Sequence, residues 1–276
     1  MTAILGIFLT IELFLVVGEG VFFTFTKGGY DWKQFLTYLG HKLGRNLLGL
    51  TSIYLAGTAL NDWFYGRRLF TLEISGPLLW VLVFVFVEFI YYWHHRLLHR
   101  VSLFWATHSV HHSPRRMNFA TSDTLGWLGG NFFLTGYVLM LPVFLLGLRP
   151  EIFMFAYRLQ LRLQLWIHTE WNPNLGWLAY VVNTPARHRA HHSMNREYQG
   201  CNYGGLLIVF DRLFGTLVEE KKGIPMVYGV EGMPVTYNPL TVNLHGWKVM
   251  TRNIRKARTL RQFFGSFLSA PPTPYR

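Results

Sequence analysis

Long apolar stretches restrict the fold of this 276-residue chain more than any other feature. A helix needs about 20 consecutive apolar residues to cross the hydrocarbon core of a bilayer. Five stretches approach that length, namely residues 3–26, 46–62, 77–94, 125–148 and 151–168. We therefore expect an all-α integral membrane protein, built as a bundle of about four or five transmembrane helices.

The overall composition favours the same class of protein. Charged residues make up 14% of the chain, against about 25% in soluble globular domains, and the mean hydropathy is +0.21. These values argue against an ordinary cytosolic enzyme. A disordered chain is excluded as well, because disordered segments have low hydrophobicity, whereas 51% of these residues are hydrophobic.

The net charge of +12, from 26 basic and 14 acidic residues, raises the question of nucleic-acid binding. The distribution of the charge argues against it, because basic residues gather in 27–45, in 95–124 and after residue 169. The expected spans place these regions on one face, which the positive-inside rule makes cytoplasmic. We expect a multi-pass protein of a bacterial inner membrane or the endoplasmic reticulum, with no nucleic-acid partner.

Nine of the 12 histidines form four groups along the chain. The groups are His95 and His99; His108, His111 and His112; His168 alone; and His188, His191 and His192. Residues three or four apart lie on one face of a helix, about 5–6 Å from each other. Each group can therefore direct its imidazoles toward one point, which is the spacing of metal ligands, and we expect a histidine-rich helical cap on the cytoplasmic face.

Local signals place the histidines at helix ends. Pro114 follows Ser113 and stops a helix just after the second group, since the residue before proline disfavours the α conformation. Thr184 and Pro185 form a cap with proline in the first turn, so a helix begins just before the last group.

The number of imidazoles exceeds what one ion can coordinate, so the sequence implies two ions. Imidazole suits zinc, copper, iron and nickel, and spacing alone does not choose among them. The single Cys201 excludes a cysteine-based zinc or iron–sulfur site. The zinc hydrolase signature HExxH is absent. Two irons at a lipid-facing site would suit attack on an unactivated C–H bond.

At these residues the sequence resembles the fatty acid hydroxylase superfamily, also called the sterol desaturase family. The resemblance covers roughly residues 80–240 and is carried by four segments. They are 88–99, 105–113, 183–192, and Asn202-Tyr-Gly-Gly followed by 211–216. Within the superfamily, Ile167-His-Thr-Glu170 and the stretch 183–205 are similar to alkylglycerol monooxygenase and its bacterial relatives. Residues 117–119 depart from those members, so the substrate stays open among fatty acyl, sterol and ether lipids.

The resemblance implies a membrane-bound non-haem di-iron oxygenase that uses O₂ and two external electrons to hydroxylate or desaturate a lipid. It also implies a set of nine metal ligands. These are His95, His99, His108, His111, His112, His168, His188, His191 and His192. No cytochrome b5 segment, flavin fingerprint or cysteine cluster is visible, so we expect a separate electron donor of the cytochrome b5 or ferredoxin type.

Two carboxylates are candidates for a catalytic role. Glu88 lies two helical turns before His95 and could orient a ligand imidazole through its second nitrogen, or form a hydrogen bond inside the helix packing. Glu170 follows His168 and could be a ligand or a base beside the metals, or a rim residue paired with an arginine. Both alternatives stay open at this point.

The chain divides into three expected regions: an N-terminal transmembrane region (1–76), a catalytic domain (77–240) and a basic C-terminal segment (241–276). Apolar residues recur at three- and four-residue steps from Trp247 to Phe267, which predicts one amphipathic helix. Such a helix could lie in the headgroup plane or pack on the cytoplasmic domain. We also expect Asp211 and Arg212 to close a structural ion pair.

Two other classes of function remain as alternatives. A non-enzymatic membrane protein could bind metal or haem through bis-histidine sites. It would carry histidines along a path through its spans, whereas here they cluster near one face. A zinc-dependent membrane hydrolase would act without O₂ or a reductant.

Overall fold

The computed structural model describes residues 2–26, 29–47, 50–127 and 136–271, and every regular element in these ranges is a helix. The α-helices are α1 (Thr2–Thr26), α2 (Trp32–Leu47), α3 (Leu50–Tyr65), α4 (Gly76–Arg100), α5 (Ser102–His108), α6 (Gly136–Leu145), α7 (Pro150–Leu163), α8 (Pro185–His192), α9 (Val209–Leu213), α10 (Pro239–Lys256) and α11 (Leu260–Leu268). Short 3₁₀ helices are η1 (Phe119–Asp123), η2 (Gln164–Ile167), η3 (Gly176–Tyr180) and η4 (Arg196–Tyr198). The all-α class is confirmed.

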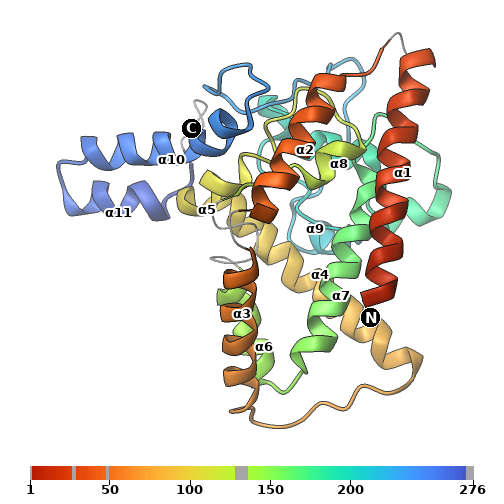
Figure 1. The fold of residues 1–276 in the computed structure, drawn as a ribbon, viewed down its shortest axis with the longest axis vertical. Coiled ribbons are helices and arrows are strands. Elements are labelled where there is room, and N and C mark those ends of the chain that lie inside the picture. The colour runs from red at the N-terminus through yellow and green to blue at the C-terminus, as the bar shows by residue number, and fades with distance from the viewer. Residues whose placement is uncertain (1, 27–28, 48–49, 128–135, 272–276) are drawn as a thin grey trace.

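Helix α4 connects the apolar part of the fold to the histidine groups (Figure 1). Pro77 lies in its first turn and no glycine or proline follows until it ends at Arg100. Its 25 residues make a helix about 37 Å long at 1.5 Å per residue. The apolar first half packs against α6 and α7. The shared core contains Val83, Val87, Ile90, Tyr91, Phe144, Phe153 and Tyr157.

Within the described ranges, α4 is the one helix long and apolar enough to cross a membrane. The expected span 151–168 ends early, because α7 stops at Leu163 and the chain tightens into η2. At 14 residues, α7 is about 21 Å long, short of a bilayer core of about 30 Å. Part of the expected span 125–148, residues 128–135, lies outside the described residues, as do residues 48–49 of span 46–62. The bundle of four or five spans is therefore not confirmed.

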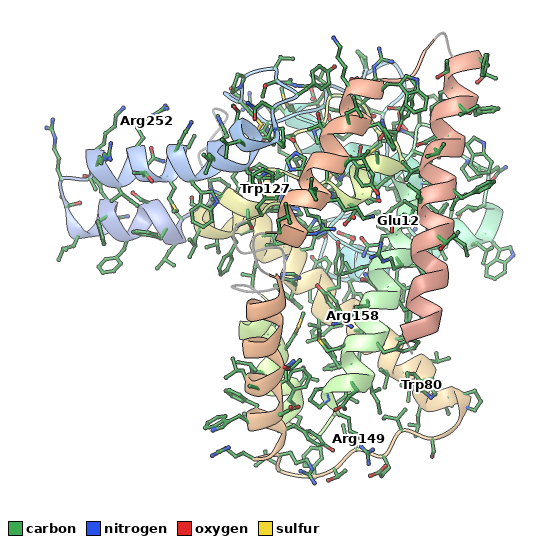
Figure 2. The ribbon with its side chains drawn as sticks, viewed as in Figure 1. Glu12, Trp80, Trp127, Arg149, Arg158 and Arg252 are labelled. Carbon is green, nitrogen blue, oxygen red and sulfur yellow. The ribbon has the colours of Figure 1, made fainter. Side chains whose placement is uncertain are left out.

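Helix α1 covers the expected span 3–26 and carries two carboxylates that face the protein. Glu12 is 4% exposed and bonds Lys42 on α2 (Nζ–Oε1 3.1 Å) and Arg162 on α7. Figure 2 shows Glu12 pointing from α1 toward these neighbours. Glu19 accepts hydrogen bonds from the Thr169 hydroxyl and from the backbone N–H of Phe119, both at 2.6 Å. These bonds tie α1 to the segments around the histidine groups.

The basic C-terminal segment forms a hairpin of two helices and not the single amphipathic helix that the periodicity predicts. Helix α10 ends at Lys256, and the Thr259 hydroxyl then accepts a hydrogen bond from the N–H of Gln262, which caps α11. The two helices project from the body of the molecule (Figure 1). The Thr259 cap therefore begins a second helix inside the periodic apolar pattern, and the chain reverses between the two helices.

The histidine-bearing ends of α4, α5 and α8 meet with η2 above the apolar part of the fold (Figure 1). As predicted, α8 begins after Thr184, whose hydroxyl accepts from the N–H of Arg187, and has Pro185 in its first turn. The helix predicted to continue through the second group to Pro114 is shorter than expected: α5 has seven residues and ends at His108, and the turn after it carries His111 and His112. The Thr184 cap fixes the start of α8, α5 packs against α4, and the imidazoles of these elements converge in the interior.

Candidate metal centre

The nine histidines predicted from spacing come together in two groups. We call them the five-histidine cluster and the four-histidine cluster. The first contains His95, His99, His108, His112 and His191, and the second contains His111, His168, His188 and His192. Within each cluster the nearest ring nitrogens all lie within 4.8 Å of one another. The clusters adjoin, since the rings of His112 and His192 stack with their centroids 4.2 Å apart.

The ring nitrogens approach one another too closely and too often for imidazole–imidazole hydrogen bonding to explain. In the five-histidine cluster, Nε2 of His108 lies 3.1 Å from Nε2 of both His95 and His99. In the four-histidine cluster, Nε2 of His168 lies 2.8 Å from that of His188 and 3.3 Å from that of His111. A hydrogen bond between two imidazoles needs one N–H donor and one acceptor nitrogen. Three ring nitrogens in mutual contact therefore cannot all be paired by hydrogen bonds to one another.

These spacings fit a metal ion as the common partner. Ligand nitrogens at about 2.1 Å from an ion are separated by about 3.0 Å in octahedral geometry and about 3.4 Å in tetrahedral geometry. The short separations of 2.8–3.3 Å lie close to this range, and all ligand atoms of a cluster lie within 4.8 Å of one another. In addition, the buried Nε2 atoms of His112 and His191 have no hydrogen-bond partner among the described residues. A buried polar atom without a partner calls for an explanation, and a metal ion in the five-histidine cluster, to which both residues belong, would supply it.

In three of the nine histidines a backbone carbonyl holds the second ring nitrogen. Nδ1 of His95 lies 2.9 Å from the carbonyl oxygen of Tyr203, and Nδ1 of His191 lies 2.9 Å from that of Cys201. Nδ1 of His168 lies 2.8 Å from the carbonyl oxygen of Gln164. Each Nδ1 donates its proton there, which leaves Nε2 with a free lone pair pointing into the cluster. Such partners fix the tautomer and the orientation of metal-binding imidazoles.

Burial keeps these imidazoles neutral. Desolvation lowers the pKa of His111 and of His191 to about 4, although backbone hydrogen bonds oppose the shift. Desolvation also lowers the pKa of His168, His188 and His192 well below the usual value, and neighbouring imidazoles add to the effect. Metal ligation requires neutral imidazole, so the clusters are in the correct protonation state at pH 7.

The loop 201–207 supplies two of the carbonyls and is itself braced from several sides. Asn202 adopts a left-handed conformation (φ 51°), and its amide bonds the carbonyl oxygens of Arg187 and Val218. The Asp211 carboxylate accepts hydrogen bonds from the N–H groups of Tyr203 (2.8 Å) and Gly204 (2.6 Å). Asn202-Tyr-Gly-Gly of this loop is part of the family resemblance, but its contact with the imidazoles was not predicted from the sequence, because backbone carbonyls leave no signature in side-chain patterns.

Asp211 does not form the ion pair expected with Arg212. Besides the backbone groups of the loop, its carboxylate accepts from the Thr216 hydroxyl at 2.6 Å. The Arg212 guanidinium instead lies over the ring of Tyr180, 5.5 Å from its centre. Adjacent residues on the short helix α9 point in different directions, so an aspartate that faces the loop cannot also meet its neighbour's side chain.

Glu88 also braces the loop. It is fully buried on α4, and its two oxygens accept from the N–H groups of Leu206 (3.2 Å) and Leu207 (2.9 Å). These bonds place it on the backbone beside Tyr203, which holds His95, and no contact with an imidazole is among its hydrogen bonds in the described structure. Of the two alternatives for Glu88, its hydrogen bonds to Leu206 and Leu207 correspond to a bond within the packing of the helix.

Glu170 lies at the rim of the site. One of its oxygens is 3.9 Å from Nε of Arg189, and its side chain is 45% exposed. Neither Glu170 nor Glu88 belongs to the groups of converging ligand atoms in the described residues. His94 lies outside both clusters as expected, with its Nδ1 2.7 Å from the hydroxyl of Tyr157.

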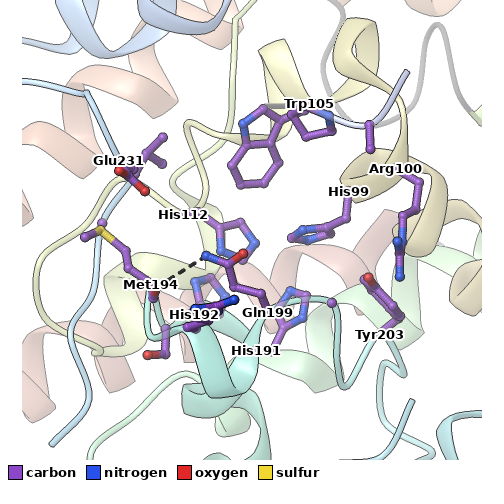
Figure 3. A pocket seen from close by; sticks show the side chains of 17 residues that line it. His99, Arg100, Trp105, His112, His191, His192, Met194, Gln199, Tyr203 and Glu231 are labelled. Atoms are coloured by element: carbon purple, nitrogen blue, oxygen red, sulfur yellow. Dashed lines mark hydrogen bonds between the residues drawn. The ribbon is translucent and has the colours of Figure 1, made fainter. Parts of the chain in front are cut away.

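A cavity of about 370 Å³ opens onto the five-histidine cluster (Figure 3). Its wall includes three imidazoles of that cluster, together with His192. Trp105 and Tyr203 flank them, and Arg100, Gln199 and Glu231 make the outer wall polar (Figure 3). No residue of the four-histidine cluster except His192 lines this cavity. A molecule in this cavity would therefore meet three imidazoles of the five-histidine cluster and one of the four-histidine cluster.

Comparison with known proteins agrees with this site. Residues 80–216 match the family model "Fatty acid hydroxylase". Human alkylglycerol monooxygenase is 35% identical over 199 residues, which cover 71% of this chain and 43% of the relative. The Xenopus tropicalis enzyme of the same name is 37% identical over 198 residues, with the same two shares. An ornithine lipid hydroxylase of Rhizobium tropici is 28% identical over 152 residues, 55% of this chain and 45% of the relative.

The chain matches less than half the length of each of these relatives. No solved structure matches it. All nine clustered histidines lie within the region that the family model matches. This chain therefore belongs to the fatty acid hydroxylase family through residues 80–216.

Proposed function

We propose that this protein is a membrane-bound lipid hydroxylase or desaturase whose two histidine clusters each hold one iron. The observation that carries the proposal is the convergence of nine imidazoles in two adjoining clusters with metal-ligand spacing. A zinc hydrolase site would typically need only three protein ligands and one ion. Nine imidazoles in two clusters, one of them next to a cavity, suit an oxidoreductase better.

When bound, a pair of irons supplies the redox chemistry by which O₂, two electrons and two protons convert a C–H bond to an alcohol and release water. The chain's own residues set the conditions for that chemistry. The carbonyls of Tyr203, Cys201 and Gln164 hold the protons of three imidazoles on Nδ1 and aim their Nε2 atoms at the metal positions. Glu88 acts as a positioning residue, because it fixes the loop that carries the Tyr203 carbonyl.

The proposed substrate is a lipid, since the similar proteins named above are lipid hydroxylases and monooxygenases. The apolar half of α4 would lie in the bilayer, with the clusters at its cytoplasmic end. Its exposed residues support this placement, because Leu78, Val81 and Leu82 are 54–70% exposed in the structure. A separate donor of the cytochrome b5 or ferredoxin type would supply the electrons, and positive charge on the cap suits an acidic donor.

A turnover assay tests the proposal. The purified protein, loaded with iron in mild detergent, is incubated with ether-linked, ornithine-linked, acyl and sterol lipids under ¹⁸O₂ with a reducing system. We expect one lipid class to gain one ¹⁸O atom or to lose two hydrogens. His191→Ala should abolish the product, whereas His245→Ala, a histidine outside both clusters, should retain it.

Other outcomes would contradict the proposal. Turnover without O₂ and reductant indicates the hydrolase alternative. A Soret band in the purified protein, together with no product from any lipid class, indicates the haem-binding alternative.

A further inference from the structure

The hairpin of α10 and α11 carries positive charge without any negative charge, and the proposed reaction leaves it unused. Residues 239–268 contain no aspartate or glutamate. The basic residues of the hairpin are Lys248, Arg252, Arg255, Lys256, Arg258 and Arg261. Every one of them is exposed, and none pairs with a carboxylate among the salt bridges of the described residues. Such a surface repels itself and attracts a partner that carries negative charge.

The second feature of the hairpin is an exposed apolar face on α11. Leu260, Phe264 and Leu268 are 77%, 56% and 64% exposed. They recur every four residues, so they lie along one side of the helix. Phe263 is also exposed, at 38%. Contiguous exposed apolar surface of this kind marks a contact with a membrane or another macromolecule.

The base of the hairpin is fixed to the body of the protein. Gly246 of α10 packs so closely on α5 that a Cβ there would lie 2.6 Å from the backbone of Ala106. At the other end, the carbonyl oxygen of Ser269 accepts from both the N–H and the hydroxyl of Ser102, each at 2.9 Å. The direction of the hairpin is therefore set by packing. In Figure 1 it lies across the direction of α1, α3 and α7, and α11 is on the side toward α3 and α6.

We propose that α11 lies in the headgroup layer of an anionic bilayer, with its apolar face toward the acyl chains and the basic residues of the hairpin near lipid phosphates. A helix with one apolar side and surrounding basic residues binds lipid surfaces in this orientation. Each Lys or Arg near an anionic surface adds to the attraction. The hairpin lies across the direction of the apolar helices. This is the orientation expected of an element in the membrane plane beside helices that cross the membrane.

The inference also predicts where the cavity lies relative to the lipid. Ala270 and Pro271 follow directly after α11 and line the cavity that opens onto the five-histidine cluster. With α11 in the headgroup layer, the cavity mouth lies at the lipid–water interface, and a lipid headgroup can enter its polar outer part. This step rests on the membrane location in the proposed function, and the experiment below separates the two.

The test measures the depth of single nitroxide labels on the full chain in nanodiscs that contain phosphatidylglycerol and phosphatidylcholine. The native Cys201 is buried, at 3% exposed, so unmodified protein serves as the labelling blank. Labels are introduced by Phe264→Cys on α11, by Val81→Cys on the apolar half of α4, and by Glu197→Cys on the cap. Collision of each label with O₂, which partitions into lipid, is compared with collision with a water-soluble nickel chelate.

We expect the oxygen-to-nickel collision ratio at residue 264 to be several-fold higher than at residue 197 and to approach that at residue 81. A low ratio at 264 beside a high ratio at 81 overturns the inference and leaves the membrane location intact. A low ratio at 81 as well contradicts the membrane location itself. Shielding of residue 264 from both quenchers indicates a protein partner, such as an acidic electron donor, and also overturns the inference.

A comparison of neutral with anionic nanodiscs tests the contribution of the basic residues. In nanodiscs of phosphatidylcholine alone, the ratio at residue 264 should fall, because the basic residues then lose their attraction. An equal ratio in neutral and anionic nanodiscs would contradict the role assigned to these residues.

Discussion

Replacing Asp211 by asparagine tests how the protein holds its candidate metal centre. The Asp211 side chain is completely buried, and its carboxylate accepts hydrogen bonds from Tyr203, Gly204 and Thr216. Tyr203 in turn presents its carbonyl oxygen to Nδ1 of His95. Asparagine has nearly the same shape but carries an NH₂ group in place of one oxygen. In Asp211→Asn, that group meets the N–H of Gly204 or one of the other two donors, so two donors face each other.

The expected cost follows from these contacts. One hydrogen bond to a charged acceptor, about 1.5–3 kcal/mol, is lost, and a buried donor is left unsatisfied at about 1–3 kcal/mol. We therefore expect a loss of about 3 kcal/mol in the free energy of unfolding. For a chain of this size that corresponds to a decrease in Tm of about 6–12 °C. The loosened His95 should also weaken metal binding about tenfold or more.

Thermal unfolding in mild detergent and metal content after gel filtration measure both effects. Arg212→Gln is the matched control, because Arg212 lies over Tyr180 and does not pair with Asp211. It should leave Tm and metal content close to those of the unmodified protein. If Arg212→Gln lowers Tm as much as Asp211→Asn does, the two residues act as an ion pair and the loop-bracing role of Asp211 is refuted.

Three further predictions concern other residues. Glu88→Gln places an amide donor against the N–H groups of Leu206 and Leu207 and should cost about 2 kcal/mol; an unchanged Tm would contradict its bracing role. Gly246→Leu should displace α10 from α5, because even a Cβ at this position lies 2.6 Å from Ala106; wild-type protease resistance of the hairpin would contradict that close packing. Burial raises the pKa of the Cys201 thiol to about 12, so iodoacetamide at pH 8 should label it only after unfolding; rapid labelling of folded protein would show that the thiol is accessible.

The histidine groups were predictable because their signals are local. Spacings of three and four residues place imidazoles on one helix face, and Thr184 marks where the helix of the last group starts. Pro114 does not mark the end of α5, which stops at His108, so His111 and His112 lie in a turn. The division into five and four was not predictable. The neighbours His111 and His112 belong to different clusters, as do His191 and His192. That division depends on how the rings of one segment meet those of another, which is tertiary packing.

The membrane part of the fold was harder to predict from the sequence. Hydropathy counts apolar residues but does not fix where a helix ends, so 151–168 read as a span although α7 stops at Leu163. The reversal of the C-terminal segment had a local signal, the cap at Thr259, which the apolar periodicity concealed. The partners of the imidazole Nδ1 atoms had no sequence signal, because any residue can supply a backbone carbonyl.

The central claim is that each histidine cluster holds one iron, and iron content combined with Mössbauer spectroscopy tests it most directly. The protein is purified in mild detergent after growth with ⁵⁷Fe, beside His111→Ala from the four-histidine cluster and His191→Ala from the five-histidine cluster. We predict about two irons per chain, magnetically coupled as expected for a two-metal site, with loss of the coupled signal in both variants. Zinc or no metal in protein protected from mismetallation during expression, or iron unaffected by both substitutions, would contradict the account.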